Sequence, residues 1–175
     1  RRIPVSVCLI DGTAYLFRGY YSVRSSTAPD DTPVNALIGL GNTLARLLRE
    51  REPSHVAVAF DAGRYNFRHR LDPTYKANRG APPEDLVPQF DLAQQLTEAM
   101  GLTTLCIPDF EADDVLATLT TIVREEGHEV MLVSGDKDLG QLLVPGVRLF
   151  DLAKREELGA DDLPARMGVR ADQVV

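Results

Sequence analysis

The most constraining feature of this sequence is an alternation of short apolar runs with segments whose apolar residues recur at helical spacing. Such alternation is typical of a parallel sheet with helices packed on both faces. Strands are expected at 5–10, 55–60, 103–107, 129–133 and 147–150. The sequence therefore predicts a three-layer α/β fold with a mostly parallel central sheet.

The expected helices lie between these strands. They cover a segment that starts at Thr32-Pro33 and runs through Leu48, then 85–100, 111–126, 138–143 and 162–167. In the helix at 111–126 one apolar stripe faces the sheet, formed by Val115, Leu116, Leu119, Ile122 and Val123. Gly101 and Gly127 are expected to end the helices that precede them.

Length and composition favour one ordinary globular domain. The 175 residues are 44% hydrophobic and contain no apolar stretch long enough to cross a bilayer. Without a signal-like N-terminus, we expect a cytoplasmic protein. Cys8 and Cys106 each lie in an apolar run without metal-ligand spacing, so both are interpreted as core residues and no zinc site is expected.

Acidic residues recur where the expected strands end. In a parallel sheet these ends share one edge, where open α/β folds bind their ligands. Four separate chain segments would therefore deliver carboxylates to one cleft. The residues are Asp11, Asp61, Asp109 with Glu111, and Asp136 with Asp138.

The segment Glu111-Ala112-Asp113-Asp114 adds more acid at a helix start, where the helix dipole favours negative charge. Glu111 and Asp114 share a helix face, whereas Asp113 points about 100° away from Asp114. Taken singly, each Asp is more simply explained as a helix cap or turn former. Taken together, so many like charges need cations among them.

Carboxylate oxygens are the ligands that Mg²⁺ and Mn²⁺ prefer. Two such ions about 3.5–4 Å apart suit hydrolysis of phosphodiesters. The sequence contains neither a nucleophile elbow nor a P-loop, which disfavours a serine nucleophile and nucleoside triphosphate hydrolysis.

A basic and aromatic stretch, RYNFRHRLDPTYKANR, follows the second expected strand and covers residues 64–79. Against the single acid Asp72 and a net charge of −7 for the whole chain, its cations are Arg64, Arg68, Arg70, Lys76 and Arg79. Cations bind phosphates, and aromatic rings such as that of Tyr75 stack on unpaired bases. The alternative is a solvated loop that balances the acidic surface.

The motifs together resemble the 5′ nuclease superfamily of flap endonucleases and the 5′-3′ exonuclease domain of bacterial DNA polymerase I, with a PIN-like fold. The matching blocks occur in order along nearly the whole chain. They are DGTAYLFRGYY at 11–21, FDAGRYNFRH at 60–69, YKANR at 75–79, EADD at 111–114 and SGDKDLGQLL at 134–143.

The resemblance implies a role for each matching residue. The first metal site would comprise Asp11, Asp61, Glu111, Asp113 and Asp114. Asp136 and Asp138 would contribute to a second site, with Asp113 between the two. Lys76 and Arg79 would act with Asp113 in catalysis by contacting the scissile phosphate. Tyr75 would stack on displaced bases, and Arg64, Arg68 and Arg70 would bind DNA. The segment after Asp11 is interpreted as a loop that mixes packing and DNA-facing aromatic residues.

The resemblance also implies an organisation and partners. Residues 1–175 would form one nuclease domain with an arch-like insertion at about 64–90. In the family, two further metal-binding aspartates and a helix-hairpin-helix-type element follow, and this chain lacks them. We therefore expect an incomplete second metal site and a weak grip on duplex DNA. The expected partner is DNA with a 5′ flap or free 5′ end. The protein would be monomeric and associated with the nucleoid. At full length it would be either part of a DNA polymerase I, with an attached polymerase domain, or a free-standing nuclease.

Two other functions remain open from the sequence. A PIN-like ribonuclease would use the same carboxylate chemistry on single-stranded RNA, although the YKANR block argues against it. A DNA-binding fragment without turnover would retain salt-sensitive binding but not cleavage.

Overall fold

The structure, a computed structural model, describes residues 6–174 and is built on one six-stranded sheet with the order β3-β2-β1-β4-β5-β6. Neighbouring strands from β3 to β5 pair in parallel, whereas β6 pairs with β5 in antiparallel fashion. The strands are β1 (Ser6–Asp11), β2 (His55–Phe60), β3 (Thr103–Cys106), β4 (Glu129–Val133), β5 (Val147–Asp151) and β6 (Glu156–Leu158). The prediction of a mostly parallel sheet is confirmed.

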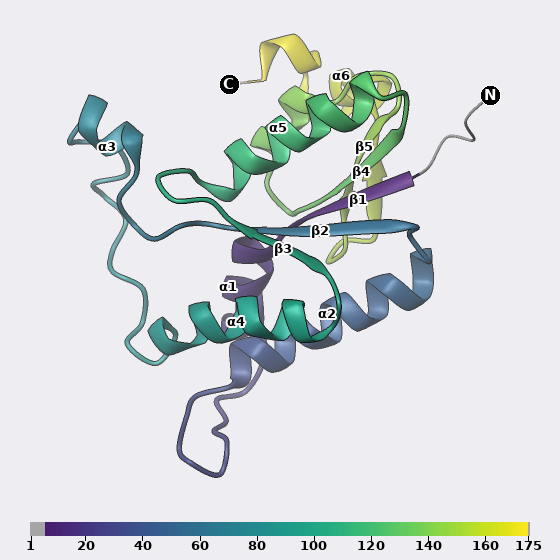
Figure 1. Cartoon of the computed structure of the whole chain (residues 1–175). Helices are drawn as coiled ribbons and strands as arrows, with labels where there is room; N and C mark the ends of the chain where they lie inside the picture. The colour runs from purple at the N-terminus through teal and green to yellow at the C-terminus, as the bar shows by residue number, and fades with distance from the viewer. Residues whose placement is uncertain (1–5, 175) are drawn as a thin grey trace.

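Helices cover both faces of this sheet (Figure 1). One face carries α1 (Gly12–Ser22), α2 (Asn35–Arg51) and α4 (Val87–Ala99). The opposite face carries α5 (Ala112–Glu125), the 3₁₀ helix η1 (Asp138–Leu142) and α6 (Leu163–Met167). The short α3 (Phe67–Leu71) lies apart from both layers, and the 3₁₀ helices η2 (Ala160–Asp162) and η3 (Ala171–Gln173) flank α6.

The alternation of side chains along β1 divides the core into two clusters. Cys8 and Ile10 pack toward α1 and α2, and Leu9 packs on the opposite face against α5. Successive strand residues point to opposite faces, so an uninterrupted apolar run requires cover on both sides. This is the three-layer arrangement that the apolar strand runs predict.

The segment after Asp11 is a helix, so its interpretation as a loop was wrong. The carboxylate of Asp11 accepts a hydrogen bond from the Ala14 N–H at 2.9 Å and thereby caps α1. Tyr15 is 3% exposed and belongs to the core, whereas Phe17 and Tyr20 are partly buried beside it.

Several boundaries also differ from the prediction. Helix α2 begins at Asn35 and not at Pro33, because Pro33 forms a β-bridge with Thr27 and the Val34 N–H donates to the Ser26 carbonyl. Strand β6 was not predicted. Ile122 was expected in the apolar stripe of α5, but it lies at the edge of that stripe and is 48% exposed. Val5, the first residue of the expected first strand, lies outside the described residues.

The crossing of α1 and α2 depends on two glycines. An added Cβ at Gly39 would lie 2.4 Å from the Cα of Gly19, so neither helix tolerates a side chain there. This close approach fixes how α1 packs on α2. Since α1 starts directly after β1, it also fixes the start of α1 relative to the end of that strand. None of the helices between residues 6 and 174 combines the length and apolar composition needed to span a membrane.

Candidate functional site

Asp11 occupies the centre of the sheet edge, at the end of β1, and is 5% exposed. Besides capping α1, its carboxylate accepts a hydrogen bond from the Ser134 hydroxyl at 2.8 Å, just beyond β4. The pKa of Asp11 is raised to about 6, chiefly by burial and to a smaller extent by the nearby charges of Asp61 and Asp136, against the lowering effect of these hydrogen bonds. Asp11 is thus held in place by hydrogen bonds, and ionising its carboxylate costs more free energy than ionising an exposed aspartate.

Asp61 follows β2 directly and faces the start of α5. Its carboxylate accepts the Ala112 N–H at 2.7 Å, while its own N–H donates to the Thr13 hydroxyl at 2.8 Å. Burial raises the pKa of Asp61, with the charge of Glu111 adding to the effect. Asp61 therefore contacts two helix starts, α1 through its backbone N–H and α5 through its carboxylate.

Asp113 lies half-buried on the first turn of α5 and faces the same edge. Burial, followed by repulsion from Asp11, Asp136 and Asp61, raises the pKa of Asp113 to about 7. These interactions place four carboxylates from four chain segments within electrostatic reach of one another. We call the set the acidic edge: Asp11, Asp61, Asp113 and Asp136.

The loop after β4 places Asp136 and Asp138. The carboxylate of Asp136 accepts the Asp138 N–H at 2.9 Å, and the Asp136 N–H donates to the Ser134 hydroxyl at 3.0 Å. Both aspartates are exposed, whereas Ser134 is fully buried. Ser134 thus links Asp11 to the Asp136 loop. This role was not predicted from the sequence, although Ser134 begins the SGDKD block that carries part of the resemblance.

Glu111 and Asp114 form ion pairs with cations of the basic stretch, unlike the carboxylates of the acidic edge. The Lys76 ammonium lies 2.9 Å from each oxygen of Glu111, and the Tyr75 hydroxyl donates to it at 3.1 Å. Arg68 forms a bidentate ion pair with Asp114, at 2.7 and 2.6 Å. Asp114 also accepts the Glu111 N–H at 3.0 Å, so its carboxylate binds the backbone of the residue at which α5 begins.

The pKa values of these two acids move in the opposite direction to those of Asp11, Asp61 and Asp113. Burial would raise the pKa of Glu111, but hydrogen bonds from Lys76 and Tyr75 outweigh it and lower that pKa. The hydrogen bonds from Arg68 lower the pKa of Asp114. Both acids therefore stay charged at neutral pH while paired with cations.

The remaining cations of the basic stretch lie farther out. Arg70 forms an ion pair with Asp109, on the outer side of α3, so Asp109 does not join the acidic edge. Arg64 donates to the Arg79 carbonyl at 2.8 Å. Between residues 6 and 174 there is no ready-made cluster of three or more His, Cys, Asp or Glu side chains arranged to hold a metal ion. Mutual repulsion and the pairing with Arg and Lys are the physical reasons.

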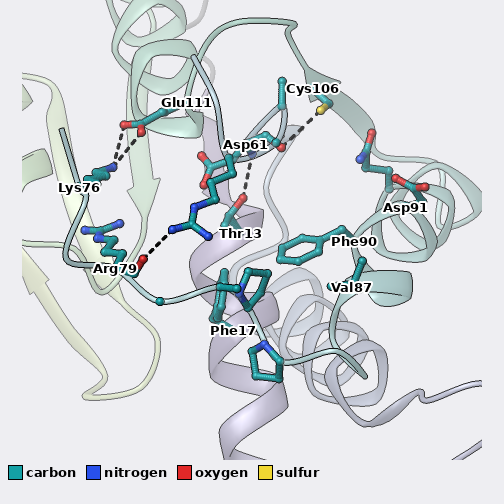
Figure 2. Close-up of a pocket in the computed structure, with 18 of the residues that line it drawn as sticks. Thr13, Phe17, Asp61, Lys76, Arg79, Val87, Phe90, Asp91, Cys106 and Glu111 are labelled. Atoms are coloured by element: carbon teal, nitrogen blue, oxygen red, sulfur yellow. Dashed lines mark hydrogen bonds and ion pairs between the residues drawn. The ribbon is translucent and has the colours of Figure 1, made fainter. Parts of the chain in front are cut away.

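A cavity of about 1040 Å³ opens beside the acidic edge (Figure 2). Lys76, Arg79, Asp61 and Glu111 form its polar side, and the apolar side consists of Phe17, Val87 and Phe90 with other residues of α1 and α4. Its basic wall is thus continuous with the acidic edge.

The two cysteines have different surroundings. Cys8 is fully buried, as predicted, and burial raises the pKa of its thiol to about 12. Cys106 is only partly buried and lines the cavity, with its thiol donating to the Asp61 carbonyl at 3.6 Å. The prediction that it is a core residue was therefore wrong, because β3 is the edge strand next to the cavity.

With an open α/β sheet whose strand ends carry carboxylates beside a basic segment, this chain is a member of the 5′ nuclease superfamily. The chain belongs to the family of 5′-3′ exonuclease N-terminal resolvase-like domains, whose family model matches residues 6–168.

The chain has curated relatives of two kinds. It is 38% identical over 175 residues to a DNA polymerase I of Rhizobium leguminosarum, covering 95% of this chain and 17% of that relative. It is 39% identical over 184 residues to a 5′-3′ exonuclease of Mycobacterium tuberculosis, covering 93% of this chain and 57% of the relative. The chain therefore spans about a sixth of the first relative and just over half of the second.

Solved structures share the fold. The 5′-exonuclease of bacteriophage T5 with bound zinc matches with a TM-score of 0.78 at 23% identity, over 97% of this chain and 64% of that one. A flap endonuclease of the same phage, in a complex with DNA and metal ions, matches with a TM-score of 0.74 at 24% identity, over 97% of this chain and 63% of that one.

Proposed function

We propose that this chain is the nuclease domain of a structure-specific 5′ nuclease that hydrolyses DNA phosphodiester bonds at 5′ flaps and free 5′ ends. The observation that carries the proposal is the acidic edge. Four carboxylates from separate segments meet there beside a basic segment, and burial together with their mutual repulsion raises the pKa of Asp11 to about 6 and that of Asp113 to about 7. A divalent cation that binds between these carboxylates would relieve their repulsion and so stabilise the folded protein.

The donor set fits Mg²⁺ or Mn²⁺, because it consists of carboxylate oxygens and contains no thiolate or imidazole. The first ion would be held by Asp11, Asp61, Glu111, Asp113 and Asp114, and a second by Asp113, Asp136 and Asp138. The chemistry supplied by a bound pair would be activation of a water nucleophile and stabilisation of charge on the leaving oxygen.

The ion pairs of Glu111 and Asp114 suggest two successive roles for Lys76 and Arg68, first as partners of these acids and then as phosphate ligands. In the DNA-free protein, Lys76 and Arg68 neutralise these acids. Once cations replace them at the carboxylates, both side chains become available to a phosphate. Lys76 would then hold the scissile phosphate together with Arg79. Tyr75, which stacks edge-on against His69, would present its ring to a displaced base.

Arg64 and Arg70 would bind the DNA backbone farther from the reacting phosphate, since both are exposed. The segment at about 64–90, which includes α3 and reaches the start of α4, would form an arch over the site. We propose that the full-length protein acts in DNA replication and repair and carries a polymerase domain, as its DNA polymerase I relatives do. A duplex-gripping region would follow the nuclease domain in that full-length protein.

The Asp113→Asn variant tests this function most directly. It keeps the shape of the side chain but removes one negative charge shared by both proposed ions. We expect it to reduce Mg²⁺- or Mn²⁺-dependent cleavage of a 5′-flap DNA by at least about 10³-fold, with an unchanged circular dichroism spectrum. Cleavage at the wild-type rate would overturn the proposed site.

The substrate arms of the assay separate the alternatives. Faster cleavage of single-stranded RNA than of flap DNA would indicate a PIN-like ribonuclease. Tight, salt-sensitive binding of flap DNA without cleavage by the wild type would indicate a binding domain without turnover. Asp172→Asn, which removes an exposed acid in η3 away from the acidic edge, is a control expected to cleave normally.

A further inference from the structure

Asn66 is a buried amide that connects two elements of the site. It is 5% exposed and immediately precedes α3. Its carbonyl oxygen accepts the Arg68 N–H at 3.0 Å and so caps α3, while its amide nitrogen donates to a Glu111 oxygen at 2.8 Å. One side chain thus satisfies a helix start in the basic stretch and a carboxylate at the start of α5.

The orientation of this amide follows from its partners. A backbone N–H can meet only the oxygen, and a carboxylate can meet only the NH₂ group. The His69 ring lies beside the amide, with Nδ1 3.0 Å from the Asn66 oxygen, and packs between Tyr65 and Tyr75. His69 thus contacts the same amide oxygen that caps α3.

Asn66 differs from the other donors to Glu111. Lys76 and Tyr75 are the residues proposed to meet DNA, so their bonds to Glu111 would change when a phosphate binds. Asn66 is buried away from the surface that would meet DNA, so we expect its bond to Glu111 to remain when a phosphate binds. Because the amide is uncharged, it orients the carboxylate without cancelling the negative charge that a cation needs.

We propose that Asn66 is a positioning residue for the metal centre, which fixes the Glu111 carboxylate from the N-cap of α3. This inference rests on the proposed function, since Glu111 is a proposed metal ligand. It implies that the start of α3 and the orientation of Glu111 are set by the same side chain. Movement of α3 would therefore reach the Glu111 carboxylate through the Asn66 amide, alongside the ion pair that joins Arg68 of α3 to Asp114.

Two substitutions separate the cap from the contact with Glu111. Serine caps helices about as well as asparagine but is too short to reach Glu111. Alanine loses both the cap and the contact. Asn66→Ser should therefore alter the metal site alone, whereas Asn66→Ala should also destabilise the protein by about 1 kcal/mol.

The test is titration calorimetry of Mn²⁺ into the DNA-free protein, together with thermal unfolding without metal. We expect both variants to bind Mn²⁺ about tenfold more weakly than the wild type. The unfolding temperature of Asn66→Ser should stay within about 2 °C of the wild type, and that of Asn66→Ala should fall further. Raising Mn²⁺ should recover flap cleavage by Asn66→Ser.

Asn35→Ser is the matched control. Asn35 is 3% exposed at the start of α2 and hydrogen-bonds to Tyr20 and Gln89, away from the acidic edge. Its loss should leave Mn²⁺ affinity unchanged even where it lowers stability. Wild-type Mn²⁺ affinity in Asn66→Ser overturns the positioning role alone. Absence of Mn²⁺ binding by the wild type overturns the proposed function and this inference together.

Discussion

At the scale of residues, the site contains carboxylates of two kinds. Asp11, Asp61 and Asp113 have neighbours of the same charge and raised pKa values. Glu111 and Asp114 have cationic partners and lowered pKa values. A divalent cation that enters the site would reduce the repulsion among the first group of carboxylates. To bind Glu111 and Asp114 it must also displace Lys76 and Arg68 from them. Metal binding and the release of Lys76 and Arg68 are therefore expected to be linked.

The raised pKa values predict how the stability of the metal-free protein depends on pH. An unfolded Asp has a pKa of about 3.9, below the values of about 6 for Asp11 and about 7 for Asp113. Between these limits the folded protein binds protons that the unfolded chain releases. Lowering the pH from about 8 to about 5.5 should therefore raise the unfolding temperature in EDTA by about 2–6 °C.

The same measurement contains its own controls. Asp113→Asn should flatten this rise, because one of the two titrating groups is gone. Below about pH 4 stability should fall again, as Glu111 and Asp114 take up protons and lose their ion pairs. A metal-free unfolding temperature that falls steadily from pH 8 to pH 5.5 would contradict the repulsion assigned to the acidic edge.

At the scale of elements, the position of α1 is decided by its two ends. Asp11 caps its first turn, so the helix starts where β1 stops. Farther along, Gly19 contacts Gly39 of α2, and the Cα atoms approach without side chains between them. A proposed metal ligand thus serves as a helix cap, and the packing of α1 on α2 holds that cap in place.

Helix α2 offers a matched pair of glycines that tests this crossing. Gly39→Ala would place a Cβ 2.4 Å from Gly19 and should destabilise the protein by about 1–3 kcal/mol. In Gly41→Ala the new Cβ would meet Leu96 at 3.6 Å, an ordinary contact. That variant should be neutral or stabilising by up to about 1 kcal/mol, because alanine favours helix. Urea unfolding measures both. Equal effects would show that helix propensity and not packing dominates.

At the scale of the whole molecule, charge is separated by sign. The net charge of −7 would repel DNA, yet the segment 64–79 carries five cations and one acid. Binding must therefore be local and must depend on salt. Arg64, Lys76 and Arg79 line the cavity beside the acidic edge, which makes them the cations best placed for phosphates even though Lys76 is paired with Glu111 in the protein alone.

About three phosphate contacts predict that flap-DNA affinity falls roughly 40-fold between about 50 and about 200 mM salt. The measurement is fluorescence anisotropy with the Asp113→Asn variant, which prevents cleavage. Arg79→Ala should reduce the slope of log affinity against log salt by about 0.9. Arg49→Ala removes an exposed cation near the end of α2 and should leave the slope unchanged. Equal changes in both would indicate that net charge, not the basic segment, governs binding.

The sequence by itself determined the layered architecture and the place of the acids. Apolar runs of strand length alternate with helical periods, and an aspartate or glutamate follows four of the strands. The capping pair Glu111 and Asp114 follows from helix geometry, and Gly127 ends α5 with a φ of 81°. All of these are local properties, because neighbouring residues and a fixed period decide them.

Only the tertiary structure decided which charges meet. Lys76 and Glu111 are 35 residues apart and Arg68 and Asp114 are 46 apart, so no local pattern could pair them. The exposure of Ile122, the helical state of α1 and the contact of Asn66 with Glu111 depend likewise on how layers pack. Periodicity predicts which side chains of one element share a face. Which residues of another element they contact depends on how distant segments pack.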